Sequence, residues 1–281
     1  MSDSTPRTWL VTGASTGFGR ALAEAIISGG DVVVATARQP ESLEDLASRA
    51  PDQCHALALD VTRPGAASEA VREALDRAGR IDVLVNNAGR GLLGAVEECS
   101  EAEARACMEL NFFGQLAVLQ AVLPHFRARK SGHVVQMGAA AAIGNYAGFG
   151  IYGAAKAAIS SVMESLAQET RALGIHVTLV EPGPFRTDFI GRSMARAAAT
   201  LPEYAATAGR FGQYLGKIDG KQPGDPHRAA ALIVRMVQSG QAPLRLVLGK
   251  YAIDKTRRTF AARERELAAH EADGVATDAP Q

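Results

Sequence analysis

A short apolar segment followed by three closely spaced glycines most constrains what this chain can fold into. Residues 8–12 are typical of a buried strand, Gly13, Gly17 and Gly19 follow, and residues 20–28 continue at helical spacing. Glycine allows positive φ angles and a close approach of backbone to ligand, and the free N–H groups at the start of a helix favour phosphate groups. The segment therefore predicts a strand, a phosphate-binding loop and a helix.

The rest of the chain repeats this alternation. Strands are expected over residues 31–37, 55–59, 81–85, 175–180 and 243–249, helices over 64–79, 100–129 and 225–239, and a strand, a glycine-broken loop and the start of a helix over 133–160. Such alternation predicts an α/β fold with a doubly wound parallel sheet and right-handed crossovers. We expect residues 251–269 to be helical and residues 271–281 to be disordered.

Length and composition limit the classes of protein that the chain can belong to. With 281 residues and 47% hydrophobic content it can bury one large core, so we expect one domain of about residues 7–250 with a C-terminal extension. Thirty basic and thirty acidic residues give no net field for nucleic acid or an anionic membrane. No signal peptide or apolar run of membrane-spanning length is recognised, which predicts a cytoplasmic protein. The cysteines and histidines show no metal-ligand spacing, so no metal is expected.

Tyr152 and Lys156 are the first candidates for chemistry. They are four residues apart, so on a helix their side chains lie on one face within reach of each other. A nearby cation favours the phenolate, which would lower the pKa of the tyrosine towards a value useful for proton transfer. Taken alone, such a pair is common on ordinary helices, and its meaning depends on the other motifs.

Those motifs together resemble the short-chain dehydrogenase/reductase family. They are Gly-Ala-Ser-Thr-Gly-Phe-Gly at 13–19, Asn-Asn-Ala-Gly at 86–89, Asn111, Tyr152-x-x-x-Lys156 and Pro182-Gly183, in the family's order and spacing from about residue 7 to about residue 187. The resemblance implies a Rossmann-like single domain that transfers hydride between a nicotinamide cofactor and a carbonyl or alcohol carbon. Tyr152 would be the acid or base, Lys156 would hold the ribose, and the backbone carbonyl of Asn111 would hold a water of a proton relay.

The same resemblance implies a cofactor site. Asp60 and Val61 would contact the adenine, Pro182 and Gly183 the nicotinamide, and Thr187 the carboxamide. The full expected set is Gly13, Ser15, Thr16, Gly17, Phe18, Gly19, Arg38, Asp60, Val61, Asn87, Ala88, Gly89, Tyr152, Lys156, Pro182, Gly183 and Thr187. Where NAD enzymes place a carboxylate after the second strand, this chain has Ala37 followed by Arg38, and an arginine can accept the 2′-phosphate of NADP. The sequence thus favours NADP(H) over NAD(H).

One catalytic position departs from the family pattern. The family places a serine thirteen residues before its tyrosine, and here that position is Ala139. Losing one donor to an oxyanion costs roughly 3 kcal/mol, about a hundred-fold in rate. Three explanations remain open: an engineered knockout, an enzyme whose substrate or backbone supplies the missing hydrogen bond, and a cofactor-binding protein without turnover. We favour an oxidoreductase with impaired or atypical activity over an NADP(H)-sensing interaction module, because Tyr152 and Lys156 are retained.

Residues 188–223 show no strong strand signal and predict several small helical pieces. Their aromatic and apolar residues are Phe189, Ile190, Met194, Tyr204, Phe211 and Tyr214. Because loops at strand ends set specificity in such folds, this segment is a candidate substrate lid, with an ordinary surface insertion of nearly equal weight. It favours a fairly hydrophobic ketone or secondary alcohol as substrate. The family also implies a homo-dimer or homo-tetramer formed through the two long helices.

Overall fold

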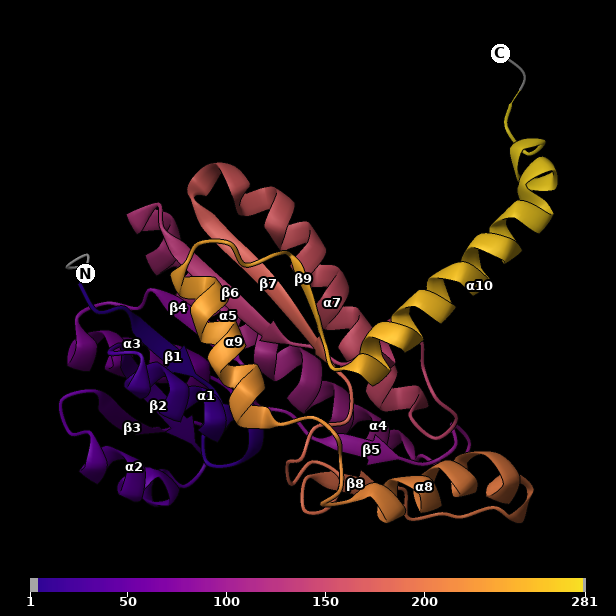
Figure 1. The fold of residues 1–281 in the computed structure, drawn as a ribbon, viewed down its shortest axis with the longest axis horizontal. Coiled ribbons are helices and arrows are strands. Elements are labelled where there is room, and N and C mark those ends of the chain that lie inside the picture. Colours follow the sequence, from indigo (N-terminus) through magenta and orange to yellow (C-terminus); the bar gives the residue numbers. More distant parts are fainter. Residues whose placement is uncertain (1–4, 280–281) are drawn as a thin grey trace.

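A seven-stranded parallel sheet forms the centre of the molecule (Figure 1). The computed structural model describes residues 5–279. The strands are β1 (Thr8–Val11), β2 (Val32–Ala37), β3 (Cys54–Ala58), β4 (Val83–Asn86), β6 (Gly132–Met137), β7 (Ile175–Pro182) and β9 (Arg245–Leu248). Their order, β3-β2-β1-β4-β6-β7-β9, runs outward from β1 in one direction and from β4 in the other. The sheet is therefore doubly wound, and the predicted fold class is confirmed.

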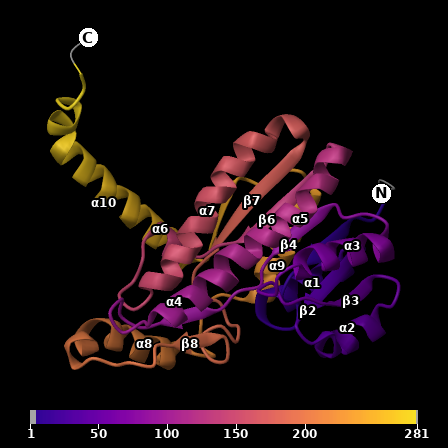
Figure 2. The same ribbon diagram turned by 180° about the vertical axis from the view of Figure 1, so that it is seen from behind.

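Helices cover both faces of this sheet. Helices α1 (Gly17–Ser28) and α9 (Pro226–Gln238) pack on one face, and α3 (Ala66–Ala78), α5 (Gly114–Arg129) and α7 (Gly150–Thr170) pack on the other, which faces the viewer in Figure 2. Successive strand residues point to opposite faces, so Trp9 and Val11 join the first core cluster while Leu10 joins the second. A short helix, α2 (Glu44–Arg49), follows a 3₁₀ turn at Pro40–Leu43.

A buried carboxylate joins the start of the sheet to α9. Asp31 accepts hydrogen bonds from Trp9 Nε1 at 2.8 Å, from the Arg7 backbone N–H at 2.9 Å and from Gln238 Nε2 at 2.9 Å. These bonds connect β1, the loop before β2 and the end of α9 far from the carboxyl edge of the sheet. The contact is structural, and no site residue takes part in it.

The long helix predicted over residues 100–129 is interrupted by one wide turn. Helix α4 (Glu101–Met108) begins with a capping box between Ser100 and Glu103, a π-turn follows at Glu109–Phe113, and α5 continues the chain. The stretch Glu101–Arg129 is long and apolar enough, by length and composition only, to cross a membrane, contrary to the expectation that no run reaches that length. In this fold α5 buries Val118, Leu119 and Val122 against the sheet as a core helix does.

Two short strands were missed by the sequence prediction. Strand β5 (Gly91–Leu93) pairs in parallel with β8 (Met194–Arg196), which lies inside the candidate lid. Three-residue strands carry too little periodic pattern to be recognised, and this pair depends on a tertiary contact. A Cβ atom added at Gly91 would lie 2.3 Å from Met194 Sδ, so glycine permits the close packing of the two strands.

The remaining elements extend the carboxyl edge of the sheet. The lid continues with a 3₁₀ turn at Pro202–Tyr204, a π-turn at Ala205–Gly209 and α8 (Arg210–Ile218), and α6 (Ala140–Ile143) interrupts the loop after β6. Helix α10 (Lys250–Val275) continues six residues beyond the predicted end at residue 269. The prediction of disorder is therefore wrong for residues 271–275, where alanine and glutamate favour a helix. Residues 280 and 281 of that predicted segment lie outside the described residues.

Candidate active site

The glycine loop between β1 and α1 forms a cradle of backbone. Gly13 and Gly17 have φ angles of 66° and 57°, in the left-handed region that favours glycine. A Cβ atom at Gly19 would lie 2.2 Å from the carbonyl oxygen of Gly13, and one at Gly13 would lie 3.0 Å from Ala88 Cα. Side chains at these positions would collide with neighbouring backbone and force the loop out of this shape. Backbone N–H groups at the start of α1 are thus left open to a phosphate, as the sequence predicts.

Thr12, which the sequence analysis did not single out, joins this loop to the Asn-Asn-Ala-Gly segment. Its hydroxyl accepts hydrogen bonds from the backbone N–H groups of Asn87 at 2.9 Å and Ala88 at 3.0 Å. In return, Asn87 Nδ2 donates to the carbonyls of Thr12 at 2.9 Å and Gly13 at 3.0 Å. The sequence feature that could have indicated this role of Thr12 is a hydroxyl residue at the end of a predicted apolar strand. The Asn87 amide and the Thr12 hydroxyl thus tie the end of β1 to the end of β4.

A cation and a carboxylate lie at the far end of the same edge. Arg38 follows β2 directly and is exposed, and within residues 5–279 its guanidinium makes no hydrogen bond or ion pair. Asp60 Oδ1 accepts from the Thr62 hydroxyl at 2.7 Å and the Thr62 N–H at 3.0 Å, and these bonds, with smaller effects of Arg38 and Arg63, lower the pKa of Asp60. The Arg38 side chain is therefore available to a ligand, beside a carboxylate that is already bonded.

Tyr152 and Lys156 lie on the first turns of α7 and are almost fully buried, at 4% exposure each. Lys156 Nζ donates to the carbonyl oxygen of Met137 at the end of β6, at 2.9 Å. Burial lowers the pKa of Lys156 to about 8. Burial also raises the pKa of Tyr152, with a smaller contribution from Cys107, so the expected lowering of the tyrosine pKa by Lys156 is not found in this structure. The phenol is consequently a protonated group at neutral pH.

Asn111 sits in the π-turn between α4 and α5 and is completely buried. Its amide Nδ2 donates to the carbonyls of Cys107 and Arg90, both at 2.9 Å, and its Oδ1 accepts from the Arg90 N–H at 3.1 Å. A Cβ atom at Gly89 would lie 2.8 Å from Asn111 Oδ1 and 3.5 Å from Lys156 Nζ, so the missing side chain lets both groups approach. The side-chain amide of Asn111 thus joins α4, through the Cys107 carbonyl, to the backbone of Arg90 just before β5.

Ala139, the position where the resemblance implies a serine, lies just beyond the carboxyl end of β6. It is the N-cap residue of α6, in extended conformation, and its methyl group joins an apolar cluster with Tyr152, Phe149 and Ile190. No side chain caps the four-residue helix α6. The structure therefore places the methyl group of Ala139 in the wall of the cavity, in the same apolar cluster as Tyr152.

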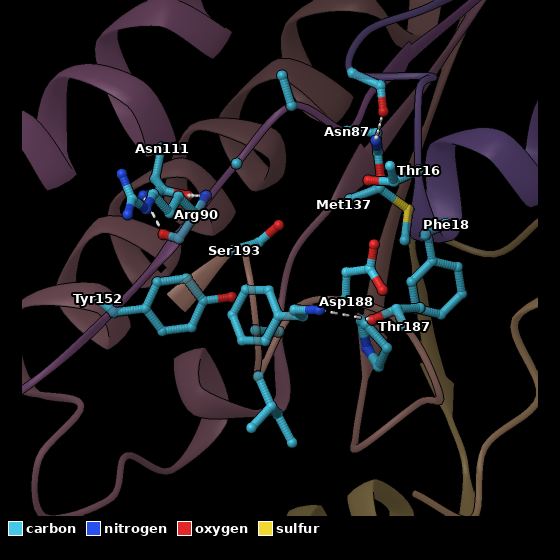
Figure 3. A pocket seen from close by; sticks show the side chains of 18 of the residues that line it. Thr16, Phe18, Asn87, Arg90, Asn111, Met137, Tyr152, Thr187, Asp188 and Ser193 are labelled. Atoms are coloured by element: carbon cyan, nitrogen blue, oxygen red, sulfur yellow. Dashed lines mark hydrogen bonds between the residues drawn. The ribbon is translucent and has the colours of Figure 1, made fainter. Parts of the chain in front are cut away.

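These groups line one cavity of about 1270 Å³ (Figure 3). Every predicted site residue lines it except Gly19, which lies behind the cradle. Pro182, Gly183 and Thr187 border it after β7, and Thr187 Cβ would be 3.4 Å from a Cβ atom at Gly17. Figure 3 shows the Tyr152 hydroxyl pointing into this space, on the side opposite Thr187 and Asp188. The shape and the glycine cradle fit a dinucleotide lying along the carboxyl edge of the sheet, with its reactive end towards Tyr152.

The candidate lid supplies an aromatic wall. Phe189 lies against Tyr152 with ring centroids 5.5 Å apart, and Phe211 stacks on Tyr146 at 5.1 Å. Of the lid residues singled out in the sequence, Phe189, Ile190, Phe211 and Tyr214 line the cavity. Met194 instead packs in the core against Gly91, and the Tyr204 hydroxyl donates to Glu97 on the surface. Tyr146 and Phe149, which precede α7, complete the wall and were missed, because their loop position carries no periodic signal.

Comparison with known proteins decides the family. A model described as short chain dehydrogenase matches residues 7–197. The chain belongs to the short-chain dehydrogenase/reductase family. This short-chain dehydrogenase is 38% identical over 247 residues to the oxidoreductase BOA17 of Botryotinia fuckeliana, which covers 88% of this chain and 90% of that protein. It is 32% identical to a 3-ketodihydrosphingosine reductase of Bacteroides thetaiotaomicron, over 87% of this chain and 88% of that one.

A solved structure agrees with this assignment. The crystal structure of a short-chain dehydrogenase from Streptomyces avermitilis is 42% identical to this chain and superposes with a TM-score of 0.92. The match covers 98% of this chain and 100% of that one. The structural match therefore extends well beyond residues 7–197, the range of the family model.

Proposed function

We propose that this short-chain dehydrogenase interconverts a ketone and a secondary alcohol with NADP(H) as cofactor. The observation that carries the proposal is the single cavity that joins the glycine cradle to the buried pair Tyr152 and Lys156. A phosphate-binding loop at one end and a proton donor at the other are the two parts that hydride transfer to a carbonyl requires. The related protein named as a keto-compound reductase supports the same class of reaction.

The chain's own part in the reaction is proton transfer and positioning. When bound, the nicotinamide cofactor would supply or accept the hydride. Tyr152 would donate its proton to the carbonyl oxygen, since burial keeps the phenol protonated at neutral pH. Lys156, held by the Met137 carbonyl, would orient the ribose hydroxyls and add positive charge beside the phenol. Asn111 would act through Arg90, whose backbone N–H and carbonyl it holds at the edge of the substrate space.

The preference for NADP(H) rests on Arg38. The residue at the end of β2 is Ala37, so there is no carboxylate to accept the ribose 2′-hydroxyl, and the neighbouring guanidinium is free to meet a 2′-phosphate. A hydrogen bond to a charged group contributes about 1.5–3 kcal/mol, which corresponds to roughly 10- to 150-fold in affinity. The variant Arg38→Asp should therefore weaken NADPH binding by that factor and leave NADH binding unchanged or stronger. The exposed Arg72→Asp on α3 is the matched control.

Catalysis is tested separately from binding. NADPH oxidation would be followed with aromatic, alicyclic and long-chain ketones, comparing wild type with Tyr152→Phe and with Tyr214→Phe from the lid. An enzyme loses its turnover in Tyr152→Phe and keeps its NADPH affinity. A cofactor-sensing interaction module, the second candidate, would show no turnover in wild type and no change of any property in Tyr152→Phe.

The aromatic wall supports a hydrophobic substrate. Phe149, Phe189 and Phe211 line the cavity, and the rings of Phe149 and Phe189 lie against that of Tyr152. A flat or long apolar ketone would replace the contacts that these rings now make with one another. We propose further that activity towards simple ketones is low, because Ala139 leaves the substrate oxygen with one donor fewer. Substrates with an internal hydroxyl donor next to the carbonyl should be reduced faster than those without one.

A further inference from the structure

Helix α10 is attached to the body of the protein by its first half alone. Lys255 Nζ lies 3.8 Å from the centroid of the Tyr146 ring, and Arg263 Nη2 donates to the Ile143 carbonyl at 2.8 Å. Residues 264–275 are all exposed, and both ribbon views show this half of the helix extending away from the body (Figures 1 and 2). An isolated helical segment of this length is marginal in water, so a further contact is needed to hold it.

A stripe of alternating charged and apolar side chains runs along α10. Its members are spaced three and four residues apart, as in the contact seam of paired helices: Lys250, Ile253, Arg257, Phe260, Glu264, Leu267, Glu271 and Val275. The four apolar members are 38%, 54%, 64% and 63% exposed in this order. Four large apolar groups in a line on one helix are an unusual surface for a helix that faces only water. We call these eight residues the α10 seam.

The charges on α10 run in the order that is unfavourable for a lone helix. The first half carries Lys250, Lys255, Arg257 and Arg258 against one acid, Asp254, and residues 264–273 carry Glu264, Glu266, Glu271 and Asp273 against one base, Arg265. The helix dipole favours acids at the start and bases at the end, and α10 has neither in its first or last turn. A second helix lying antiparallel reverses the order, so that each basic half meets an acidic half.

We propose that the α10 seam binds the α10 seam of a second copy of this chain in antiparallel orientation. A two-fold axis near Glu264 would place Arg257 of one copy opposite Glu271 of the other, and Ile253 opposite Val275. The two Glu264 carboxylates would face each other at the axis, as a like-charged pair at the centre of the seam. The helices would overlap along about 33 Å, at 1.5 Å per residue. The distal halves, unsupported in a single chain, would each gain the proximal half of the other copy as a partner. An anionic lipid surface is the less suitable occupant, because the projecting half is acidic.

Charge reversal on the full-length protein tests this pairing. The variants Arg257→Glu and Glu271→Arg should each weaken the association at least tenfold by sedimentation velocity, so that particles of half the mass appear at micromolar concentration. The double variant Arg257→Glu/Glu271→Arg should restore the association, since the two new charges again face each other across the axis. Arg258→Glu makes the same charge change off the seam and should leave the mass unchanged. Thermal melting of each variant establishes that the body is folded.

Several results would overturn the proposal. They are an unchanged mass for Arg257→Glu, an equal loss for Arg258→Glu, or a double variant that stays dissociated while it is folded. Association through the long helices α5 and α7 is a separate contact, and it would leave particles of the same mass in all four variants. Binding of wild type to phosphatidylglycerol vesicles that Phe260→Asp abolishes, with no change in mass in solution, would assign the seam to a membrane instead.

Discussion

Ala139→Ser is the substitution that separates a weakened active site from one built without serine. Residue 139 lines the cavity at the carboxyl end of β6, and its methyl group belongs to the same apolar cluster as Tyr152. A serine hydroxyl there would give the substrate oxygen a second donor beside the phenol of Tyr152. On the proposed mechanism this donor acts in the transition state, so we expect kcat to rise while the NADPH affinity stays constant.

The size of the expected effect follows from two opposing contributions. One oxyanion donor contributes about 2.7–4 kcal/mol, which is roughly a hundred- to a thousand-fold in kcat. Residue 139 is also the N-cap of α6, and a serine in that place accepts a bond from the helix backbone, which the alanine cannot do. A serine hydroxyl that is held by the backbone of α6 is less free to point at the substrate oxygen. We therefore expect kcat to rise by an amount near the lower end of this range, about a hundred-fold. The same cap should stabilise the protein by about 0.5–1 kcal/mol.

The assay compares initial rates of NADPH oxidation by wild type and Ala139→Ser with 1-tetralone, which has no internal hydroxyl donor. Ala139→Gly is the matched control, because it changes the residue and adds no hydroxyl. An unchanged or lower kcat for the serine variant, at unchanged NADPH affinity, would refute the reasoning. Residue 139 would then be a native alanine in a site that obtains its second hydrogen bond from the substrate.

Three further predictions concern charge, folding and the cradle. Lys156→Met should raise the free energy of unfolding by about 2 kcal/mol at pH 7. The substitution removes a buried charge, whose cost is seen in the lowering of the Lys156 pKa from 10.5 to about 8, and this gain is larger than the loss of one hydrogen bond to the Met137 carbonyl. In wild type the cost of burying the Lys156 charge is full below pH 8 and fades as the pH rises towards 10.5. The difference in the free energy of unfolding between Lys156→Met and wild type, measured by urea titration, should therefore shrink across that range. Asp31→Ala should cost about 2–3 kcal/mol in the same assay with kcat unchanged, because Trp9 Nε1 loses its buried acceptor; a smaller change would mean that water replaces the carboxylate. Gly19→Ala should weaken NADPH binding at least tenfold by fluorescence titration, since its Cβ would lie 2.2 Å from a loop carbonyl, while Gly216→Ala, with no atom within 4 Å, should bind normally.

The sheet and its main helices could be predicted because the pattern of apolar residues in each segment matches the burial of that segment in the fold. Residues 31–37 form a continuous apolar run, and β2 is covered by helices on both faces. Strands β5 and β8 could not be predicted, because each has three residues and depends on a partner about a hundred positions away. The end of α10 could not be predicted, because residues 271–275 combine good helix formers, Glu271 and Ala272, with poor ones, Asp273 and Gly274.

The candidate site was predictable as a set of positions and less so as a set of contacts. The motifs located the glycine cradle, Arg38 and the pair Tyr152 and Lys156. They did not reveal that Lys156 donates to a backbone carbonyl, or that burial raises the pKa of Tyr152. Such quantities depend on how much of the lid covers the tyrosine. The contribution of Phe189 to that cover is a property of folded packing, which residue spacing does not encode.

The π-turn at Glu109–Phe113 also limits how this chain can vary. A π-turn holds one residue more than an α-helical turn, so it shifts the faces of α4 and α5 by about 100° relative to each other. Deleting one residue here would restore a regular helix and, in doing so, rotate all of α4 away from β5 and α7. Insertions and deletions elsewhere in this helix are equally constrained, because the phase difference must be preserved. We therefore expect natural variants to keep the number of residues between Ser100 and Gly114 and to differ there by substitution alone.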